Sequence, residues 1–205
     1  MKSKLITFTV ALVASTAVSQ AATIVPTGYT HASGNAGPES NAGNDTTSPI
    51  RMIDNVISTG GWSDGTNVSW GQGTITATNP TAGMTFIFDQ VYDFSTINIY
   101  QNEGGGWGAT DYRISTSTDN SDFSNTTGIL DLPTGSAVSG TASTILYTLD
   151  VSSLNDAKYV QVELFNANQW VMLSEVDFDG AAVPEPSTAL LGALALLALL
   201  RRRRA

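Results

Sequence analysis

The sequence contains no cysteine, so a disulfide, a thiolate metal site and a thiol nucleophile are all excluded. It contains one histidine, His31, in a segment rich in Gly, Ser, Asn and Thr. Catalysis by a histidine base would therefore depend on one residue in an expected loop. Stability must come from core packing, with or without a metal ion.

Positive charge is scarce away from the two ends of the chain. The formal net charge is −9, but six of the nine basic residues lie within residues 1–21 or 183–205. The segment between these ends has three basic and seventeen acidic residues, a formal charge of −14. Such a surface repels nucleic acid and anionic lipid headgroups, and it attracts divalent cations or tolerates neutral sugars. Solubility alone would also explain this charge.

The first 21 residues have the pattern of a secretory signal peptide. Lys2 and Lys4 precede an apolar stretch at residues 5–18, and Ser19-Gln20-Ala21 supplies the small residues of a cleavage site. We expect signal peptidase to remove residues 1–21 and the remaining chain to be exported.

The last residues, 183–205, have the pattern of a membrane stop. Twelve consecutive apolar residues occupy positions 189–200. As a helix they would reach about 18 Å, short of the ~30 Å hydrocarbon core, so the helix is marginal as a permanent anchor. The positive-inside rule would hold the following arginines on the cytoplasmic side and place everything before the helix outside. These arginines are Arg201, Arg202, Arg203 and Arg204.

The segment Pro184-Glu185-Pro186, followed by this short helix and the arginines, resembles the PEP-CTERM sorting signal of Gram-negative bacteria. The resemblance implies a transmembrane helix in an inner-membrane intermediate and an exosortase-type protease as a partner. It also implies the cell surface or the extracellular matrix as the destination. An apolar helix packed into a core would explain neither the Pro-Glu-Pro lead nor the arginine stop.

Residues 22–182 are expected to form one all-β domain. Short runs alternate apolar and polar residues, β-branched and aromatic residues dominate these runs, and no helical period is sustained. This pattern predicts a two-sheet antiparallel β-sandwich or jelly roll, with a first strand at residues 22–25 and with the signal and sorting helices on either side. The alternation places in the core Phe86, Phe88, Ile97, Ile99, Tyr112, Ile114, Ile145, Tyr147, Leu149, Val160, Val162, Leu164, Val176 and Phe178.

Five short motifs follow one another in the order found in discoidin-like domains, also called coagulation factor type C or galactose-binding-like domains. Two departures are Asn55 in place of the usual Gly, and Gln90 where Leu-Gly is usual. The resemblance implies a jelly-roll sandwich whose loops at one end bind glycans, lipid headgroups or proteins without catalysis. The motifs are Asp54-Asn55 with Thr59 and Trp62, residues 85–97, residues 111–119, residues 158–162, and Leu173-Ser174-Glu175-Val176-Asp177-Phe178.

The same resemblance implies a structural calcium site. Bacterial relatives hold Ca²⁺ where the opening loop meets the last strand, at positions that correspond here to Asp54, Thr59 and Glu175. Hard oxygen donors suit this hard cation. Alternatively, Asp54 caps a turn, Thr59 packs, and Glu175 points outward. The acidic run at residues 119–122 lacks the glycine and distal glutamate of an EF-hand and is expected to form a hairpin turn.

A glycine-rich loop carries the candidate ligand-binding residues Asn102, Glu103 and Trp107. Little neighbouring core sequence is available to bury Trp107. The C–H face of a sugar stacks on indole, while amide and carboxylate groups bind its hydroxyls. Alternatively, Trp107 anchors the loop by packing. Packing is the expected role of the other tryptophans, Trp62, Trp70 and Trp170.

These features favour a binding protein over an enzyme. The first hypothesis is an exported, exosortase-sorted protein that binds extracellular polysaccharide, including exopolysaccharide. The second is a structural matrix or biofilm protein without a small ligand. The third is a glycoside hydrolase that uses two carboxylates such as Glu103 and Glu163, but sequence spacing does not show whether two acids face each other across a cleft.

Overall fold

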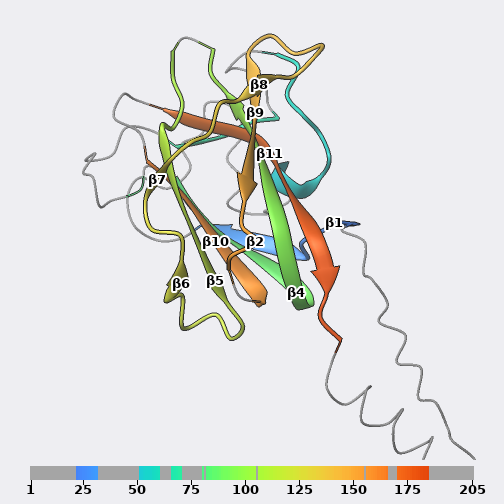
Figure 1. Ribbon diagram of the computed structural model, residues 1–205. Coiled ribbons are helices and arrows are strands. Elements are labelled where there is room, and N and C mark those ends of the chain that lie inside the picture. Colours follow the sequence, from blue (N-terminus) through green and yellow to red (C-terminus); the bar gives the residue numbers. More distant parts are fainter. Residues whose placement is uncertain are drawn as a thin grey trace, which may run out of the picture.

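The computed structural model in Figure 1 describes residues 22–31, 51–60, 66–70, 80, 82–104, 106–154, 156–165 and 170–184. Strands dominate this part of the chain, and the predicted all-β class is confirmed. The elements are β1 (Ala22–Ile24), β2 (Gly28–His31), the 3₁₀ helix η1 (Arg51–Ile53), β3 (Val68–Trp70), β4 (Ala82–Asn102), β5 (Asp111–Ser117), β6 (Asn125–Thr126), β7 (Leu130–Asp131), β8 (Ser136–Ala137), β9 (Thr144–Asp150), β10 (Ala157–Phe165) and β11 (Val171–Ala182).

The long strand β4 belongs to both layers of the sandwich (Figure 1). Its first half, Ala82 to Tyr92, pairs with β2 and β10. Its second half, Tyr92 to Asn102, pairs with β9 and β11. Strands β5, β6 and β7 extend the first layer from β10, while β1 and β3 extend the second from β11. All of these pairings are antiparallel, so one hydrogen-bonded sheet folds over along β4 to form both layers.

The apolar faces of the two layers meet in an aromatic core. Phe178 on β11 contacts Phe86 and Phe88 on β4 edge to face, with ring centroids 4.9 and 5.0 Å apart. Edge-to-face contacts of this kind add to the stabilisation from apolar burial. The predicted core residues are buried, except for Ile145 and Tyr147. These two are half-buried: Tyr147 packs against the core and also lines a pocket, whereas Ile145 does not line that pocket.

Two local predictions are confirmed. The predicted first strand is β1, which pairs with β11. The hairpin turn at residues 119–122 joins β5 to β6, with Asn120 in the left-handed conformation at φ 64°. The side chain and backbone N–H of Ser121, and then the backbone N–H of Asp122, donate to Asp119 and lower the pKa of its exposed carboxyl.

The two predicted targeting segments, residues 1–21 and 189–200, lie outside the described residues, as does Trp62. In the described part of the chain, no helix has the length and apolar character needed to cross a membrane.

Candidate functional site

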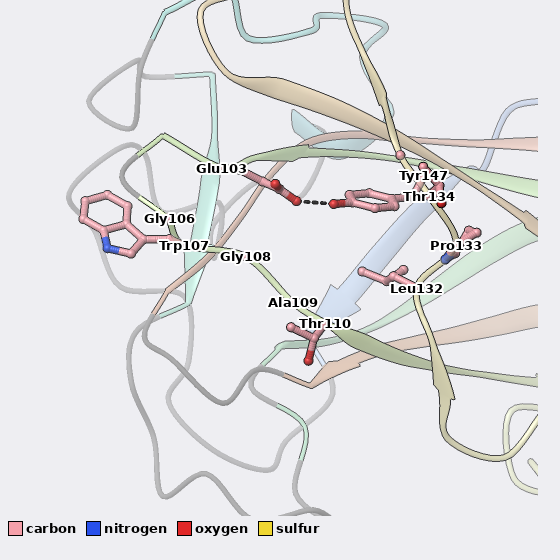
Figure 2. A pocket seen from close by; sticks show the side chains of 11 residues that line it. Glu103, Gly106, Trp107, Gly108, Ala109, Thr110, Leu132, Pro133, Thr134 and Tyr147 are labelled. Carbon is pink, nitrogen blue, oxygen red and sulfur yellow. Dashed lines mark hydrogen bonds between the residues drawn. The ribbon is translucent and has the colours of Figure 1, made fainter.

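A pocket of about 450 Å³ opens where β4 ends and β5 begins. Glu103, residues 106–110, residues 132–135 and Tyr147 on β9 line it (Figure 2). Its volume falls within the range of small-ligand sites. Because two of these segments are connections between strands and Tyr147 lies on a strand, the sandwich fixes their relative positions.

Glu103 and Tyr147 form a hydrogen-bonded pair in the wall of this pocket (Figure 2). The phenol of Tyr147 donates to Oε1 of Glu103, and Nε2 of Gln101 donates to the same oxygen at 3.0 Å. Burial raises the pKa of Tyr147, and the hydrogen bond to the Glu103 carboxylate raises it further. Tyr147 therefore remains a hydrogen-bond donor at neutral pH.

Gln101 fixes the loop that carries the rest of the wall. Its side chain is fully buried, and its Oε1 accepts the N–H of Ala109 at 2.9 Å. A Cβ at Gly108 would lie 2.6 Å from Nε2 of Gln101, and the backbone there has φ +131°, so glycine is needed. The N–H of Gly108 donates to the carbonyl of Trp170 at 3.0 Å, just before β11. The loop is thus hydrogen-bonded to β4, the strand that belongs to both layers, and to the residue just before β11.

Two of the three predicted ligand residues, Glu103 and Trp107, line the pocket, whereas Asn102 does not. Trp107 is half-buried, and its indole points away from the Glu103–Tyr147 pair (Figure 2). Asn102 is fully buried. Its Oδ1 accepts from the N–H of Gly104 at 3.0 Å and from the hydroxyl of Ser143 at 2.8 Å. Asn102 therefore holds the base of the loop.

Sequence reasoning missed the role of Tyr147, because the alternation along β9 placed it in the core. A Cβ at Gly135 would lie 2.8 Å from Cε1 of Tyr147, so the backbone can approach the ring this closely only because residue 135 has no side chain. The tyrosine hydroxyl was the only available signal, since a buried phenol normally has a hydrogen-bond partner.

Two of the three predicted calcium ligands, Asp54 and Glu175, lie close enough to interact electrostatically. Glu175 is 2% exposed, and its Oε2 has no hydrogen-bond partner among the described residues. Burial raises the pKa of Glu175 to about 8, and the carboxylates of Asp177 and Asp54 add to the rise. The backbone N–H groups of Asn55 and Val56 donate to Glu175 and partly offset these effects.

Asn55 adopts the left-handed conformation, with φ 61°. Glycine adopts this conformation most readily, and asparagine is among the few other residues that tolerate it. This backbone requirement explains how Asn55 can replace the usual glycine of the opening motif. The Oδ1 of Asp54 accepts the N–H of Val56 at 2.9 Å and so closes the same turn.

Thr59 contacts a different segment, because its carbonyl accepts the N–H of Ala142 at 3.3 Å. Among the described residues, no three His, Cys, Asp or Glu side chains gather into a group that could hold a metal ion. A cation at Asp54 and Glu175 would therefore need backbone carbonyls, hydroxyls or water as further ligands.

Glu163, the second carboxylate considered for hydrolysis, does not line the pocket. Arg113 donates from Nε to Oε2 of Glu163 at 2.6 Å and from Nη2 to Oε1 at 2.9 Å. This two-point pair joins β5 to β10, where the two residues lie opposite each other.

Residues 182–204 match the PEP-CTERM protein-sorting motif. This match confirms the predicted sorting signal at the C-terminal end. It implies a protein that passes the membrane and is processed by an exosortase. No curated protein matches the chain.

Several solved structures have a similar fold. A fucolectin from striped bass (Morone saxatilis) serum has a TM-score of 0.52 at 17% identity, covering 77% of this chain and 48% of its own. CBM32 of AlyQ in complex with 4,5-unsaturated mannuronic acid has a TM-score of 0.46 at 16% identity, covering 77% and 97%. The family 32 CBM from C. perfringens NanJ in complex with galactose has a TM-score of 0.44 at 14% identity, covering 78% and 99%.

The chain spans about half of the fucolectin chain and 35% of a longer, truncated AlyQ with CBM32 and alginate lyase domains. At these identities the likeness concerns the fold. The chain is an all-β sandwich with a fold similar to that of the fucolectin, and its residues 182–204 match the PEP-CTERM protein-sorting motif.

Proposed function

We propose that this chain is an exported protein that binds carbohydrate in the pocket between residues 103–110 and 132–135. The observation that carries the proposal is the fixed carboxylate of Glu103. Its Oε1 is held by Tyr147 and Gln101, while no described residue donates a hydrogen bond to its Oε2. Sugar hydroxyls are suitable donors for this oxygen, and Leu132 and Pro133 offer apolar surface to sugar C–H groups.

The charge distribution of the pocket favours binding over hydrolysis. Glycoside hydrolysis uses two carboxyls about 5 to 10 Å apart across the scissile bond. Among the described residues that line the pocket, Glu103 is the only carboxylate, and Glu163 is paired with Arg113 elsewhere.

Sorting to the outside of a Gram-negative cell would bring the pocket to extracellular polysaccharide. In this proposal signal peptidase removes residues 1–21, and an exosortase processes the tail at the matched motif. The protein then resides at the cell surface or in the extracellular matrix, where polysaccharide is its partner.

A calcium ion held by Asp54 and Glu175 belongs to the same proposal. The buried Oε2 of Glu175 has no described hydrogen-bond partner, and two further carboxylates lie near enough to raise the pKa of Glu175. These residues fit a hard cation, which would offset the cost of burying the charge. Thr59 is the third proposed ligand. The ion would hold the opening loop against β11, and the carbohydrate pocket is formed by other residues.

A glycan microarray probed with the full chain tests the carbohydrate proposal. We expect binding to at least one class of polysaccharide, and loss of that binding in Glu103→Ala. Asp93→Ala is the matched control, because Asp93 is an exposed acid earlier in β4 and its removal changes the net charge equally. If no glycan binds, or if Glu103→Ala binds as the wild type does, the proposal is wrong and the structural matrix protein becomes the better hypothesis.

A further inference from the structure

We propose that Glu103 makes the pocket selective for amino sugars, so that a glycan with a free protonated amine binds best, its N-acetylated form binds less tightly, and a uronate is rejected. This inference rests on the proposed carbohydrate function and adds to it the chemical class of the ligand.

The first step is the unequal environment of the two Glu103 oxygens. Oε1 accepts from Tyr147 and from Gln101, whereas Oε2 accepts from no described residue. The pocket therefore presents a negatively charged acceptor that still has capacity for a donor from a ligand.

The second step is the lack of a counter-charge. The described residues that line the pocket include no lysine, arginine or histidine. Of the three basic residues in the domain, Arg113 is already paired with Glu163. A uronate carboxylate would thus meet Glu103 without a neutralising cation, and like charges at close range oppose binding.

The third step is that the carboxylate cannot easily move aside. Gln101 is held through its hydrogen bond with Ala109, and Tyr147 lies opposite Ile99 in the β4–β9 ladder. The backbone of Gly135 packs against the Tyr147 ring. Because both donors to Oε1 are fixed, rotating Glu103 away from an anionic ligand would break two hydrogen bonds.

The fourth step is the gain that an ammonium group makes. The carboxylate accepts a charge-assisted hydrogen bond from either an ammonium or a neutral N–H. Only the ammonium adds the attraction between opposite charges, and N-acetylation removes that attraction. The expected difference in affinity between the amine and its acetylated form is about tenfold.

Two matched series of monosaccharides test this selectivity with the full chain at pH 6 by calorimetry and NMR titration. One series is glucosamine, N-acetylglucosamine and glucuronate, and the other is galactosamine, N-acetylgalactosamine and galacturonate. Within a series the ring is constant and only the charged group differs. In at least one series we expect the amine to bind about tenfold more tightly than its acetylated form, with no detectable uronate binding.

Glu103→Gln keeps the size of the side chain and removes the charge, so the amine and acetyl forms should then bind within about twofold of each other. Asp93→Asn changes the net charge equally and should retain the wild-type ratio, which excludes general attraction to an acidic protein. If Glu103→Gln does not fold, the salt dependence of the wild type is measured instead. Raising the salt from about 0.1 M to 1 M should lower the ratio of amine to acetyl binding, because salt screens the attraction between the ammonium and the carboxylate.

The inference is overturned if the wild type binds a uronate as well as the amine, if the ratio is unchanged in Glu103→Gln, or if salt leaves the ratio of the wild type unchanged. In these cases glycan binding on the array stands, and only the selectivity fails. If none of the six sugars and no array glycan binds, the proposed function itself fails, and the selectivity falls with it.

Discussion

Trp70 and Trp107 occupy contrasting environments, and their truncation should separate packing from recognition. Trp70 on β3 is 2% exposed and contacts the ring of His31 at 5.7 Å, whereas Trp107 is half-buried at the pocket. We expect Trp70→Ala to lower the free energy of unfolding by about 3–5 kcal/mol. Trp107→Ala should lower it much less and should weaken glycan binding. Thermal melts and array binding check both effects, and equal melting temperatures for the two variants would make Trp107 a packing residue.

Glu175 should make stability depend on pH when calcium is removed by a chelator. Its pKa in the folded protein, about 8, lies above the ordinary value of 4.5. The stability linked to its protonated form is therefore fully present below about pH 4.5 and is lost as the pH rises through 8. We expect the melting temperature to fall between pH 5 and pH 8, and Glu175→Gln to show a smaller fall. Parallel melting curves for the two proteins would contradict this.

Calcium should reverse this loss, because a cation stabilises the ionised carboxylate. A ligand that binds only the folded state adds about 2.7 kcal/mol at a hundredfold excess over its Kd. Adding calcium at pH 8 should raise the melting temperature by several degrees in the wild type and not in Asp54→Asn or Glu175→Gln. Thr59→Val shows whether the hydroxyl of Thr59 contributes. A wild-type melting temperature that is the same in calcium and in chelator would exclude the site.

At the scale of elements, Gly180 marks the point where β11 bulges against β4. The register shifts between Asp179 and Gly180, and a Cβ at Gly180 would lie 2.3 Å from the carbonyl oxygen of Asp93. Gly180→Ala should therefore separate the two strands and cost about 1–3 kcal/mol of stability. Gly28→Ala on β2 is the control, because nothing lies within 4 Å of its added Cβ. Urea denaturation measures both, and equal stability of the two variants would contradict the steric argument.

The alternation of apolar and polar residues predicted the class of the fold and most of the core. Successive side chains in a strand point to opposite faces of the sheet, so every second residue lies on the same face. It did not predict that residues 82–102 form one strand. Asp89, Gln90 and Asp93 are exposed at its centre and look like turn residues in the sequence. Whether such residues end a strand or continue it is decided by β10 and β11, which pair on either side of them.

The candidate site was predictable only in part for a similar reason. The glycine-rich loop indicated Glu103, but its partner Tyr147 is 44 residues away and alternates with core residues. The burial of Asn102 depends on Ser143 and Gly60, which reach it through the fold rather than through neighbouring sequence.

At the scale of the whole molecule, the sorting motif should control the final location of the protein in the cell. Replacing the arginines at positions 201–204 with serine should weaken the stop in the membrane, because arginine resists transfer across it. Replacing Pro184-Glu185-Pro186 with alanine should block processing and leave a longer precursor. Cell fractionation and gel electrophoresis measure location and size. Both variants reaching the surface at wild-type size and amount would contradict the sorting proposal.

Strand β11 connects the pocket to the sorting motif. At its start Trp170 accepts the N–H of Gly108, and at its end Val183 donates to Val91 at 3.1 Å, one residue before Pro184. While the tail is still attached, tension between a bound polysaccharide and the membrane would act along β11. The hydrogen bonds between β11 and β4 lie across this direction, so they would be loaded together in shear rather than opened one at a time. A bound polysaccharide and a membrane-held tail, as proposed, would therefore pull against this whole ladder at once.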